Sequence, residues 1–291
     1  MKFLIYGGKG WIGSMMCNLL KEQNIEYEVG KERVDNEDDL VSEIESVNPT
    51  HIMSFIGRTH GEFEGEKIKT IDYLEKSGKL VENVRDNLFS PLVLALICQK
   101  KEIHLTYLGT GCIFSQDESI IENSCGYAEV AQPDFFGSSY SVVKGFTDRL
   151  MHHFNDSVLN LRIRMPIVNY SNPRNFVTKI TQYEKVCSIN NSMTYLPELL
   201  PIALDLAIKG ETGTLNLTNP GSITHNQILE LYKTYVDPAF TWNNFTIEEQ
   251  NLILLSARSN NKLDTGKLQM MYPRVLSIYE AVEKCMKSYK L

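Results

Sequence analysis

The sequence predicts an α/β protein with a doubly wound parallel sheet and a smaller C-terminal lobe. Short apolar runs alternate with segments of helical period through the first 165 residues, and a glycine-rich turn joins the first run to the first helical segment. Such alternation is typical of parallel strands joined by right-handed helical crossovers, which cover both faces of one sheet with helices. Beyond residue 165 the alternation loosens, which predicts a second, less regular lobe.

The first strand and helix are the clearest elements. Phe3 to Tyr6 form a continuous apolar run, typical of a strand buried on both faces. Glycine ends this run, and residues 11–23 then carry apolar side chains at helical spacing. Further elements follow in chain order: strand 26–29, helix 40–47, strand 51–56, helix 83–101, strand 105–108, helix 139–154 and strand 159–165. We expect Pro91 to bend or break the helix in which it lies.

The later elements are shorter and belong to two different parts of the fold. They are a loop at 169–174, a helix at 199–209, a short strand at 214–217, a turn at 220–221, and helices at 225–235 and 277–288. We expect residues 1–165, completed by parts of 195–217, to form the lobe that carries the sheet. Residues 166–291 should form mainly the second lobe.

The composition excludes several classes of protein. With 43% hydrophobic and 22% charged residues the chain is ordinarily globular, and a net charge of −7 argues against a surface for nucleic acid. The six cysteines lack Cys-x-x-Cys spacing, so we expect reduced thiols. No signal peptide is recognisable, and no apolar run approaches the roughly 20 residues of a membrane helix. We therefore expect a cytoplasmic protein with no membrane contact, and the six histidines suggest no metal site.

Three glycines stand at steps of three between the first strand and the first helix: Gly7, Gly10 and Gly13. A turn without side chains lets the amides of a helix N-terminus approach a pyrophosphate. This spacing in this position predicts a Rossmann-type dinucleotide site to which Trp11 and Ile12 also contribute. An ordinary glycine-rich turn is the alternative.

The end of the second strand predicts which dinucleotide binds. Selectivity for the ribose phosphate is expected about 20 residues after the glycine turn, where Lys31 and Arg33 flank a single Glu32. An enzyme that prefers NADH needs a dominant carboxylate here, whereas these cations favour a 2′-phosphate. We therefore expect NADPH, bound partly by Arg33, with a solvated charged turn as the alternative.

Tyr140 and Lys144 lie one helical turn apart and should project from the same helix face. A nearby ammonium stabilises phenolate, so Tyr140 is a candidate proton donor to a carbonyl oxygen that receives hydride. Lys144 is also expected to bind the nicotinamide ribose.

Thr110 and Cys112 follow another strand, and if the chain stays extended both face the same way. Thr110 would then supply a second hydrogen bond to the carbonyl. For Cys112, the sequence alone also allows a small buried apolar side chain without a catalytic role.

Taken together, these motifs resemble those of the bifunctional UDP-4-keto-6-deoxyglucose 3,5-epimerase/4-reductase family, the plant and giant-virus enzymes of UDP-rhamnose synthesis. This family belongs to the extended short-chain dehydrogenase/reductases. The loop after Phe114 is shorter than and different from the plant form. The motifs that carry the resemblance are residues 7–13, 110–114, 139–141, 162–166, 172–179, 191–194, 218–221 and 258–261.

The resemblance implies that Cys112 and Lys179 are the acid and base of epimerisation, with neither role assigned to either residue. A C4 keto group acidifies the hydrogens on C3 and C5, so such a pair can invert both centres through an enolate. Without the resemblance, Lys179 reads as a surface lysine. The implied substrate is UDP-4-keto-6-deoxyglucose, which a separate 4,6-dehydratase would supply, and a homodimer is expected by analogy.

The remaining candidate residues come from family segments and from element ends. Arg258 is expected to meet the diphosphate, because a guanidinium fork matches phosphate oxygens. Trp242 could stack on uracil or lie in the core. Asn175 and Met193 are expected in the sugar-nucleotide pocket, Gly57 and Asn87 at the cofactor, and His225, Arg162 and Arg174 in structural positions.

Three other functions remain open on the sequence. The enzyme could act on another nucleotide, as in the GDP-fucose synthase type, although that family usually carries histidine at the position of Lys179. It could be a reductase without epimerase activity, as in the dTDP-rhamnose pathway, against which Cys112 and Lys179 argue. It could also be a non-catalytic NADP-binding regulatory subunit, like the relative that partners methionine adenosyltransferase. Intact Thr110, Tyr140 and Lys144 disfavour that reading.

Overall fold

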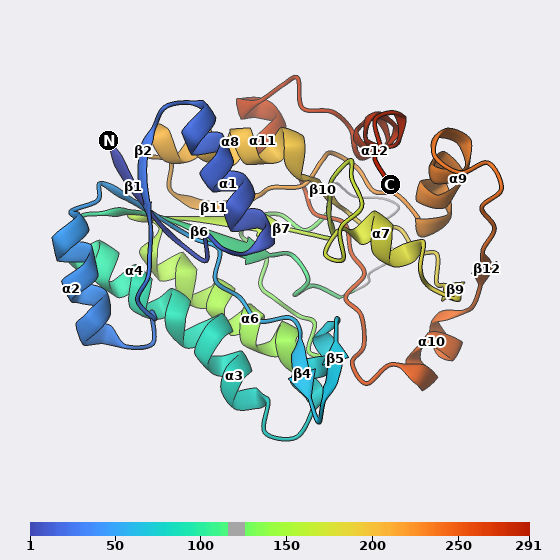
Figure 1. The fold of residues 1–291 in the computed structure, drawn as a ribbon, viewed down its shortest axis with the longest axis horizontal. Helices are drawn as coiled ribbons and strands as arrows, with labels where there is room; N and C mark the ends of the chain where they lie inside the picture. Colours follow the sequence, from blue (N-terminus) through green and yellow to red (C-terminus); the bar gives the residue numbers. More distant parts are fainter. Residues whose placement is uncertain (116–125) are drawn as a thin grey trace.

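A computed structural model describes residues 1–115 and 126–291 (Figure 1). The expected doubly wound parallel sheet is confirmed. It has six strands in the order β11-β7-β6-β3-β1-β2, and every neighbouring pair is parallel. The strands are β1 (Lys2–Tyr6), β2 (Glu26–Val29), β3 (His51–Ser54), β6 (His104–Thr110), β7 (Val158–Ile163) and β11 (Gly213–Asn216). Most of the loop after Phe114, together with Cys125, lies outside the described residues.

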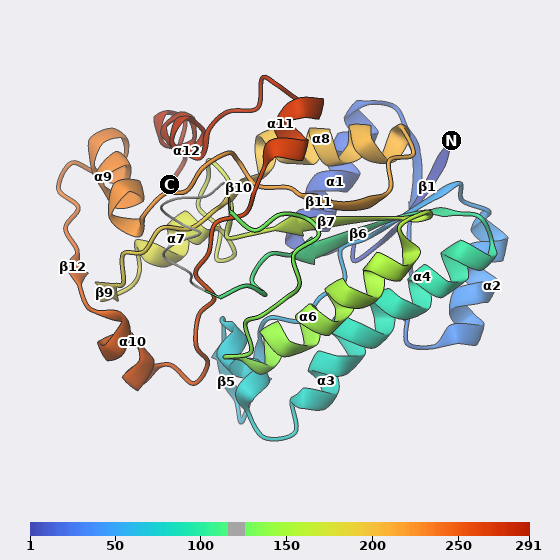
Figure 2. The ribbon, with the colours of Figure 1, turned by 180° about the vertical axis from the view of Figure 1, so that it is seen from behind.

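Alternate side chains of β1 enter two different cores. Phe3 and Ile5 pack into one cluster, and Leu4 and Tyr6 into the other, as expected for successive residues of a strand. One face of the sheet is covered by α1 (Trp11–Glu22), α8 (Leu196–Ile208) and α11 (Gly266–Met271). The other face is covered by α2 (Glu37–Val47), α4 (Ser90–Lys100) and α6 (Ser139–Met151) (Figures 1 and 2).

The second lobe has a core of its own, formed mainly by residues after Pro166. Its helices are α7 (Phe176–Ile180), α9 (His225–Tyr235), α10 (Ile247–Ile253) and α12 (Ile278–Lys287). Two pairs of two-residue strands complete it: β8 (Pro166–Ile167) with β10 (Thr194–Tyr195), and β9 (Lys185–Val186) with β12 (Asn243–Asn244). Strand β11 is part of the sheet and α8 packs against one of its faces. The chain therefore returns to the first lobe after starting the second. The division at residue 165 stays a prediction.

Pro91 does not break its helix. Residues 80–100 are helical throughout, as α3 (Leu80–Val84), a π-helical turn η2 (Arg85–Phe89) and α4. A proline removes the hydrogen bond to the carbonyl four residues earlier, here that of Asn87. The Thr147 hydroxyl of α6 donates to this carbonyl at 2.6 Å. The π turn and this bond together accommodate the proline within a continuous helix.

A small hairpin that the sequence did not predict lies beside the carboxyl edge of the sheet. Strands β4 (Gly61–Phe63) and β5 (Glu66–Ile68) are antiparallel, and the turn residues Glu64 and Gly65 both have positive φ. Two such residues in a row favour a tight hairpin turn. The 3₁₀ turn η1 (Ile71–Glu75) follows directly. Within the described ranges no helix is long and apolar enough to cross a membrane.

Candidate active site

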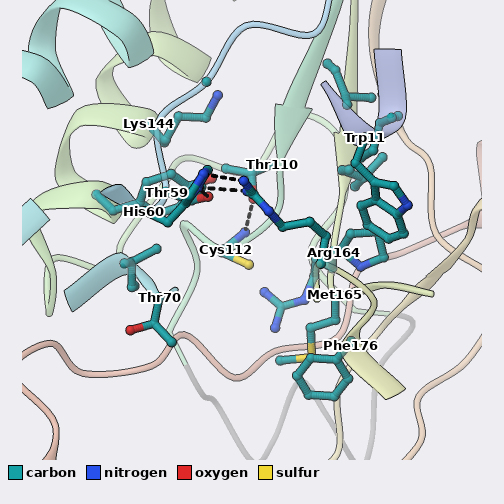
Figure 3. Close-up of a pocket in the computed structure, with 18 of the residues that line it drawn as sticks. Trp11, Thr59, His60, Thr70, Thr110, Cys112, Lys144, Arg164, Met165 and Phe176 are labelled. Atoms are coloured by element: carbon teal, nitrogen blue, oxygen red, sulfur yellow. Dashed lines mark hydrogen bonds between the residues drawn. The ribbon is translucent and has the colours of Figure 1, made fainter. Parts of the chain in front are cut away.

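A cavity of about 470 Å³ opens where β1, β3, β6 and β7 end. The carboxyl edge of a parallel sheet is the usual ligand site of this architecture. In Figure 3, Trp11 and Phe176 lie on one side of the cavity, and His60 and Lys144 on the other. Elements of both lobes therefore form its walls.

The charges around this cavity are all of one sign. Although the chain carries a net charge of −7, the described lining residues include no Asp or Glu. A cation-lined cleft concentrates anions. We conclude that the cavity suits a polyanion such as a dinucleotide or a nucleoside diphosphate. The lining cations are Lys69, Lys144, Arg164, Arg174, Lys179 and Arg258.

The glycine turn has the close packing that its motif requires. Gly7 has φ +75°, and a Cβ on Gly13 would lie 2.2 Å from the Gly7 carbonyl oxygen. Gly10 caps α1 without any side-chain hydrogen bond, so the first helical amides face the cavity unshielded. Gly10, Trp11, Ile12 and Gly13 all line the cavity, whereas Gly7 shapes the turn from behind. The structure thus provides a cradle for a pyrophosphate.

Gly57 and Asn87 also line this end of the cavity. Asn87 accepts a hydrogen bond from the Arg58 amide at 2.9 Å and donates to the Arg58 carbonyl at 2.8 Å. Its amide therefore fixes the loop that follows β3.

Arg33 lies outside the cavity, and its exposed guanidinium is 2.8 Å from Asp35. Its contact with a 2′-phosphate stays a prediction.

Tyr140 and Lys144 both face the cavity, but their pairing differs from the sequence expectation. Lys144 is 4% exposed, bonds to the Tyr107 hydroxyl, and its Nζ lies 4.6 Å from the centre of the Tyr107 ring. Burial lowers the pKa of Lys144 to about 8. The pKa of Tyr140 is raised, by burial above all and by a negative Cys112, and its hydrogen bond with Thr110 offsets this only in part. The expected lowering of the Tyr140 pKa by Lys144 is therefore not found. Sequence reasoning missed Tyr107, which lies three residues before Thr110 on the same strand.

Thr110 and Cys112 do not continue as an extended strand. The Thr110 hydroxyl accepts the Cys112 amide hydrogen at 3.1 Å, so the chain turns as β6 ends (Figure 3). The Ser141 hydroxyl of α6 donates to the Cys112 carbonyl at 2.8 Å. The backbone of Cys112 is thus held from both sides, while its side chain lines the cavity. Both residues still face the cavity, though through a turn.

A second cavity of about 800 Å³ adjoins the first and shares Cys112, Tyr140 and Arg258 with it. Arg258 is 2.5 Å from the Asp72 carboxylate. Burial raises the pKa of Asp72, but hydrogen bonds, from Arg258 above all, outweigh it and hold the pKa at about 2. Arg258 is therefore oriented at the boundary of the two cavities, where a diphosphate could join two parts of one ligand.

Lys179 of α7 lines the first cavity from the second lobe. Burial lowers its pKa, and the charges of Arg174 and Arg258 lower it further. Arg174, expected to be structural, is a cavity residue instead, and its Nη1 is 2.8 Å from Nδ1 of His60. The sequence offered no signal for this contact, because its partners are 114 positions apart.

Two expected substrate residues do not line either cavity. Asn175 is fully buried and caps α7 through the Val177 amide, and its side-chain nitrogen bonds to the Val168 carbonyl at 2.9 Å. Met193 is 1% exposed and lies in the core of the second lobe. They support the segment that presents Lys179 rather than contacting the cavity. Trp242 likewise packs against the second core.

Two further residues were given no role from sequence. Arg162 is fully buried and paired with Asp148 at 2.7 Å, as expected of a structural residue. His225 lines the second cavity, where burial lowers its pKa to about 4.

The fold and the cavity define a dinucleotide-dependent enzyme of the extended short-chain dehydrogenase type. The glycine cradle, the Tyr140–Lys144 pair and the cationic walls together suit hydride chemistry on a nucleotide-linked carbonyl compound. The chain belongs to the NAD dependent epimerase/dehydratase family, whose model matches residues 3–183.

Similar proteins cover the whole chain. The crystal structure of the L780 UDP-rhamnose synthase from Acanthamoeba polyphaga mimivirus has 52% sequence identity and a TM-score of 0.95, with 99% of both chains covered. The bifunctional dTDP-4-dehydrorhamnose 3,5-epimerase/dTDP-4-dehydrorhamnose reductase of Arabidopsis thaliana is 43% identical over 284 residues, which are 97% of this chain and 91% of that relative.

A longer plant protein also matches. The trifunctional UDP-glucose 4,6-dehydratase/UDP-4-keto-6-deoxy-D-glucose 3,5-epimerase/UDP-4-keto-L-rhamnose-reductase of Arabidopsis thaliana is 43% identical over 98% of this chain. The match spans only 41% of that relative's length. A dTDP-4-dehydrorhamnose reductase from Bacillus anthracis, solved with NADP, shares the fold at 17% identity and a TM-score of 0.78, with 97% of both chains covered.

Proposed function

We propose that this enzyme epimerises UDP-4-keto-6-deoxy-D-glucose at C3 and C5 and then reduces the 4-keto group with NADPH, which gives UDP-L-rhamnose. One observation carries the proposal: a reducing pair and an acid/base pair open onto one cation-lined cavity. The 52% identity to a UDP-rhamnose synthase supports it. The NADP-bound reductase of the same fold and the cations at the end of β2 support NADPH as the cofactor.

Cys112 and Lys179 reach the cavity from different lobes, which suits proton transfer on opposite faces of a sugar ring. One group removes the hydrogen next to the keto group, and the other returns a proton on the far face. Tyr140 and Thr110 stabilise the C4 oxyanion with hydrogen bonds. The same steps repeated at the other carbon complete the epimerisation.

Reduction uses the other part of the same cavity. NADPH bound along the glycine turn supplies a hydride to C4. Tyr140 donates a proton to the C4 oxygen, and Thr110 holds that oxygen through a hydrogen bond. Lys144, held by Tyr107, positions the ribose and carries the positive charge behind the phenol. No substrate movement between sites is required.

The nucleotide base is the open part of this proposal. Arg258 binds the diphosphate, and the second cavity takes the nucleoside. A dTDP-linked substrate is the second candidate, since the bifunctional plant relative is named for dTDP-4-dehydrorhamnose. Parallel kinetics with UDP-, dTDP- and GDP-linked 4-keto-6-deoxy sugars decide between them, with the highest kcat/KM expected for UDP.

We also propose a cytoplasmic homodimer that receives its substrate from a separate 4,6-dehydratase. Helices α3, α4 and α6 lie side by side (Figure 2). Large apolar side chains are exposed on them and on η2, which suits a second copy of the same face. These residues are Leu80, Val81, Val84, Phe89, Leu96 and Phe146. Light scattering should give the mass of two chains, and Phe146→Glu should give that of one.

The experiment that tests the main proposal offers UDP-4-keto-6-deoxyglucose and NADPH in heavy water. We expect cofactor oxidation together with deuterium at C3 and C5 of the product, measured by NMR. Oxidation without deuterium would reduce the protein to a simple reductase. No oxidation with any of the three nucleotide sugars would favour a regulatory role instead.

A further inference from the structure

Two buried arginines, two positions apart, differ in how their charges are balanced. Arg162 is fully buried and lies 2.7 Å from the carboxylate of Asp148. Arg164 is 1% exposed, and no carboxylate among the described residues lies within ion-pair distance of it. An isolated buried charge costs several kcal/mol. Folding stability therefore does not explain why a charged side chain is buried at position 164.

The hydrogen bonds of Arg164 do not explain its charge either. Its guanidinium donates to the Gly111 carbonyl at 2.8 Å, to the Ser259 carbonyl at 2.9 Å and to the Asn191 amide oxygen. All these acceptors are neutral, so none of them balances the charge of the guanidinium. The Nε of Arg164 is buried and has no hydrogen-bond partner among residues 1–115 and 126–291. Its guanidinium thus holds a positive charge at a cavity wall with no protein counter-ion in the part of the chain described here.

The segment held by Arg164 carries Cys112. A Cβ on Gly111 would lie 3.1 Å from both Cγ and Cδ of Arg164 and 2.6 Å from Cδ1 of Leu263. Only glycine therefore lets the arginine side chain lie against the turn between Thr110 and Cys112. Figure 3 shows Arg164 and Cys112 at the same wall of the cavity.

We propose that Arg164 is a positioning residue for the epimerisation: it fixes the Gly111–Cys112 turn, and its charge favours the thiolate form of Cys112. The proposal rests on the proposed function and makes Cys112 the base. The thiolate takes the hydrogen from C3 or C5, an S–H bond forms, and the C–H electron pair enters the enolate. The ammonium of Lys179 then protonates the opposite face, and exchange with water restores both groups.

The charges around Cys112 agree with this assignment. Burial lowers the pKa of Arg164, and the charge of a negative Cys112 raises it through space. A negative Cys112 also raises the pKa of Lys144 and of Tyr140. The other titratable groups that line the two cavities with it are His60, Lys69, Asp72, Arg174, Lys179, Tyr183, Glu184, Lys185, Cys187, His225, Glu249 and Arg258.

Alkylation of the free protein tests the charge without any substrate. The rate of iodoacetamide attack on Cys112 is followed against pH by peptide mass spectrometry, with Cys112→Ala to identify the peptide. In Arg164→Gln we expect the midpoint of the profile to rise by about one pH unit, and the rate at neutral pH to fall about tenfold. Arg164→Lys keeps the positive charge but loses the planar guanidinium group, and it should retain the wild-type midpoint.

Cooperative thermal unfolding and a circular dichroism spectrum like that of wild type show that each variant is folded. If Arg164→Gln and wild type share one midpoint, the proposal is wrong. It is equally wrong if the midpoint in Arg164→Lys shifts as far as that in Arg164→Gln. The midpoint would then depend on the position of the side chain rather than on its charge. Because this assay needs no sugar nucleotide, its failure is distinct from a failure of the proposed function.

Turnover gives a second, independent readout. Arg164→Gln should lower deuterium exchange at C3 and C5 about tenfold more than it lowers the reduction of an already epimerised UDP-4-keto-L-rhamnose. In a Cys112→Ala background, Arg164→Gln should add no further loss of exchange. An additive loss would assign Arg164 to the substrate oxyanion and overturn its role at Cys112.

Discussion

The two walls of the cavity are built in opposite ways. The cofactor wall depends largely on backbone, because the turn from Gly7 to Gly13 presents amides and leaves no room for a side chain at Gly7 or Gly13. The substrate wall is mostly side chains, with Arg174, Lys179 and Arg258 converging from distant segments. Backbone recognises what all dinucleotides share, whereas side chains select one substrate. The difference explains how one common fold can acquire epimerase chemistry by changing only one wall.

The largest effect should come from Tyr140→Phe on the reducing side. Loss of the proton donor should lower the rate of NADPH oxidation by about 10²- to 10⁴-fold. NADPH binding, followed by fluorescence, should stay within a few-fold of wild type. A reduction rate within tenfold of wild type would remove Tyr140 from the acid role.

Lys179→Gln tests the opposite wall. We expect deuterium exchange into UDP-4-keto-6-deoxyglucose to fall about hundredfold, because the acid/base pair loses one member. Reduction of UDP-4-keto-L-rhamnose should change much less. Lys209→Gln, an exposed lysine paired with Asp205, is the matched control and should behave as wild type. Equal losses in both reactions would mean that the two walls do not act separately.

Arg33→Ala tests the selectivity predicted for the cofactor wall. Loss of one charge-assisted contact to the 2′-phosphate should reduce the preference for NADPH over NADH by about tenfold. The ratio of kcat/KM for the two cofactors measures it. A preference equal to that of wild type would place the selecting residue elsewhere.

A smaller effect concerns the opposite edge of the sheet, where the ring centres of His51 and His104 lie 5.3 Å apart with the two planes tilted by 43°. Burial lowers the pKa of His51 to about 4 and also lowers that of His104, so both are neutral in the folded protein. Their contribution to stability is complete above the unfolded value of 6.5 and is lost as the pH falls toward 4.

Urea midpoints measured from pH 7 to pH 4 should therefore fall more steeply for wild type than for a His51→Gln/His104→Gln variant. Parallel slopes would show that this pair does not contribute to acid unfolding. The variant should bind NADPH normally at pH 7, since the pair lies away from the cavity.

The sequence predicts local features of the structure well. The glycine turn and the Tyr140–Lys144 pair depend on spacing within one turn or helix, so a reader of the sequence can find them. Arg174 and Tyr107 act through contacts made only after folding, with His60 and Lys144 respectively, and neither contact leaves a spacing signal.

Two residues lie in surroundings that the sequence does not indicate, for the same physical reason. Pro91 indicates a break locally, but Thr147 from another helix satisfies the freed Asn87 carbonyl. Asn175 belongs to a segment that contacts the cavity, yet its own amide is used to cap α7. Family segments identify where a site lies, whereas the hydrogen bonds of each side chain decide whether it faces the ligand.

The most direct test of two separate chemistries in one cavity is NADPH oxidation by Cys112→Ala with two substrates. With UDP-4-keto-L-rhamnose, which is already epimerised, we predict a rate within a few-fold of wild type. With UDP-4-keto-6-deoxyglucose we predict a loss of about hundredfold, both in this rate and in deuterium exchange at C3 and C5 in heavy water. Equal loss with both substrates, or deuterium uptake that persists without Cys112, would contradict this account.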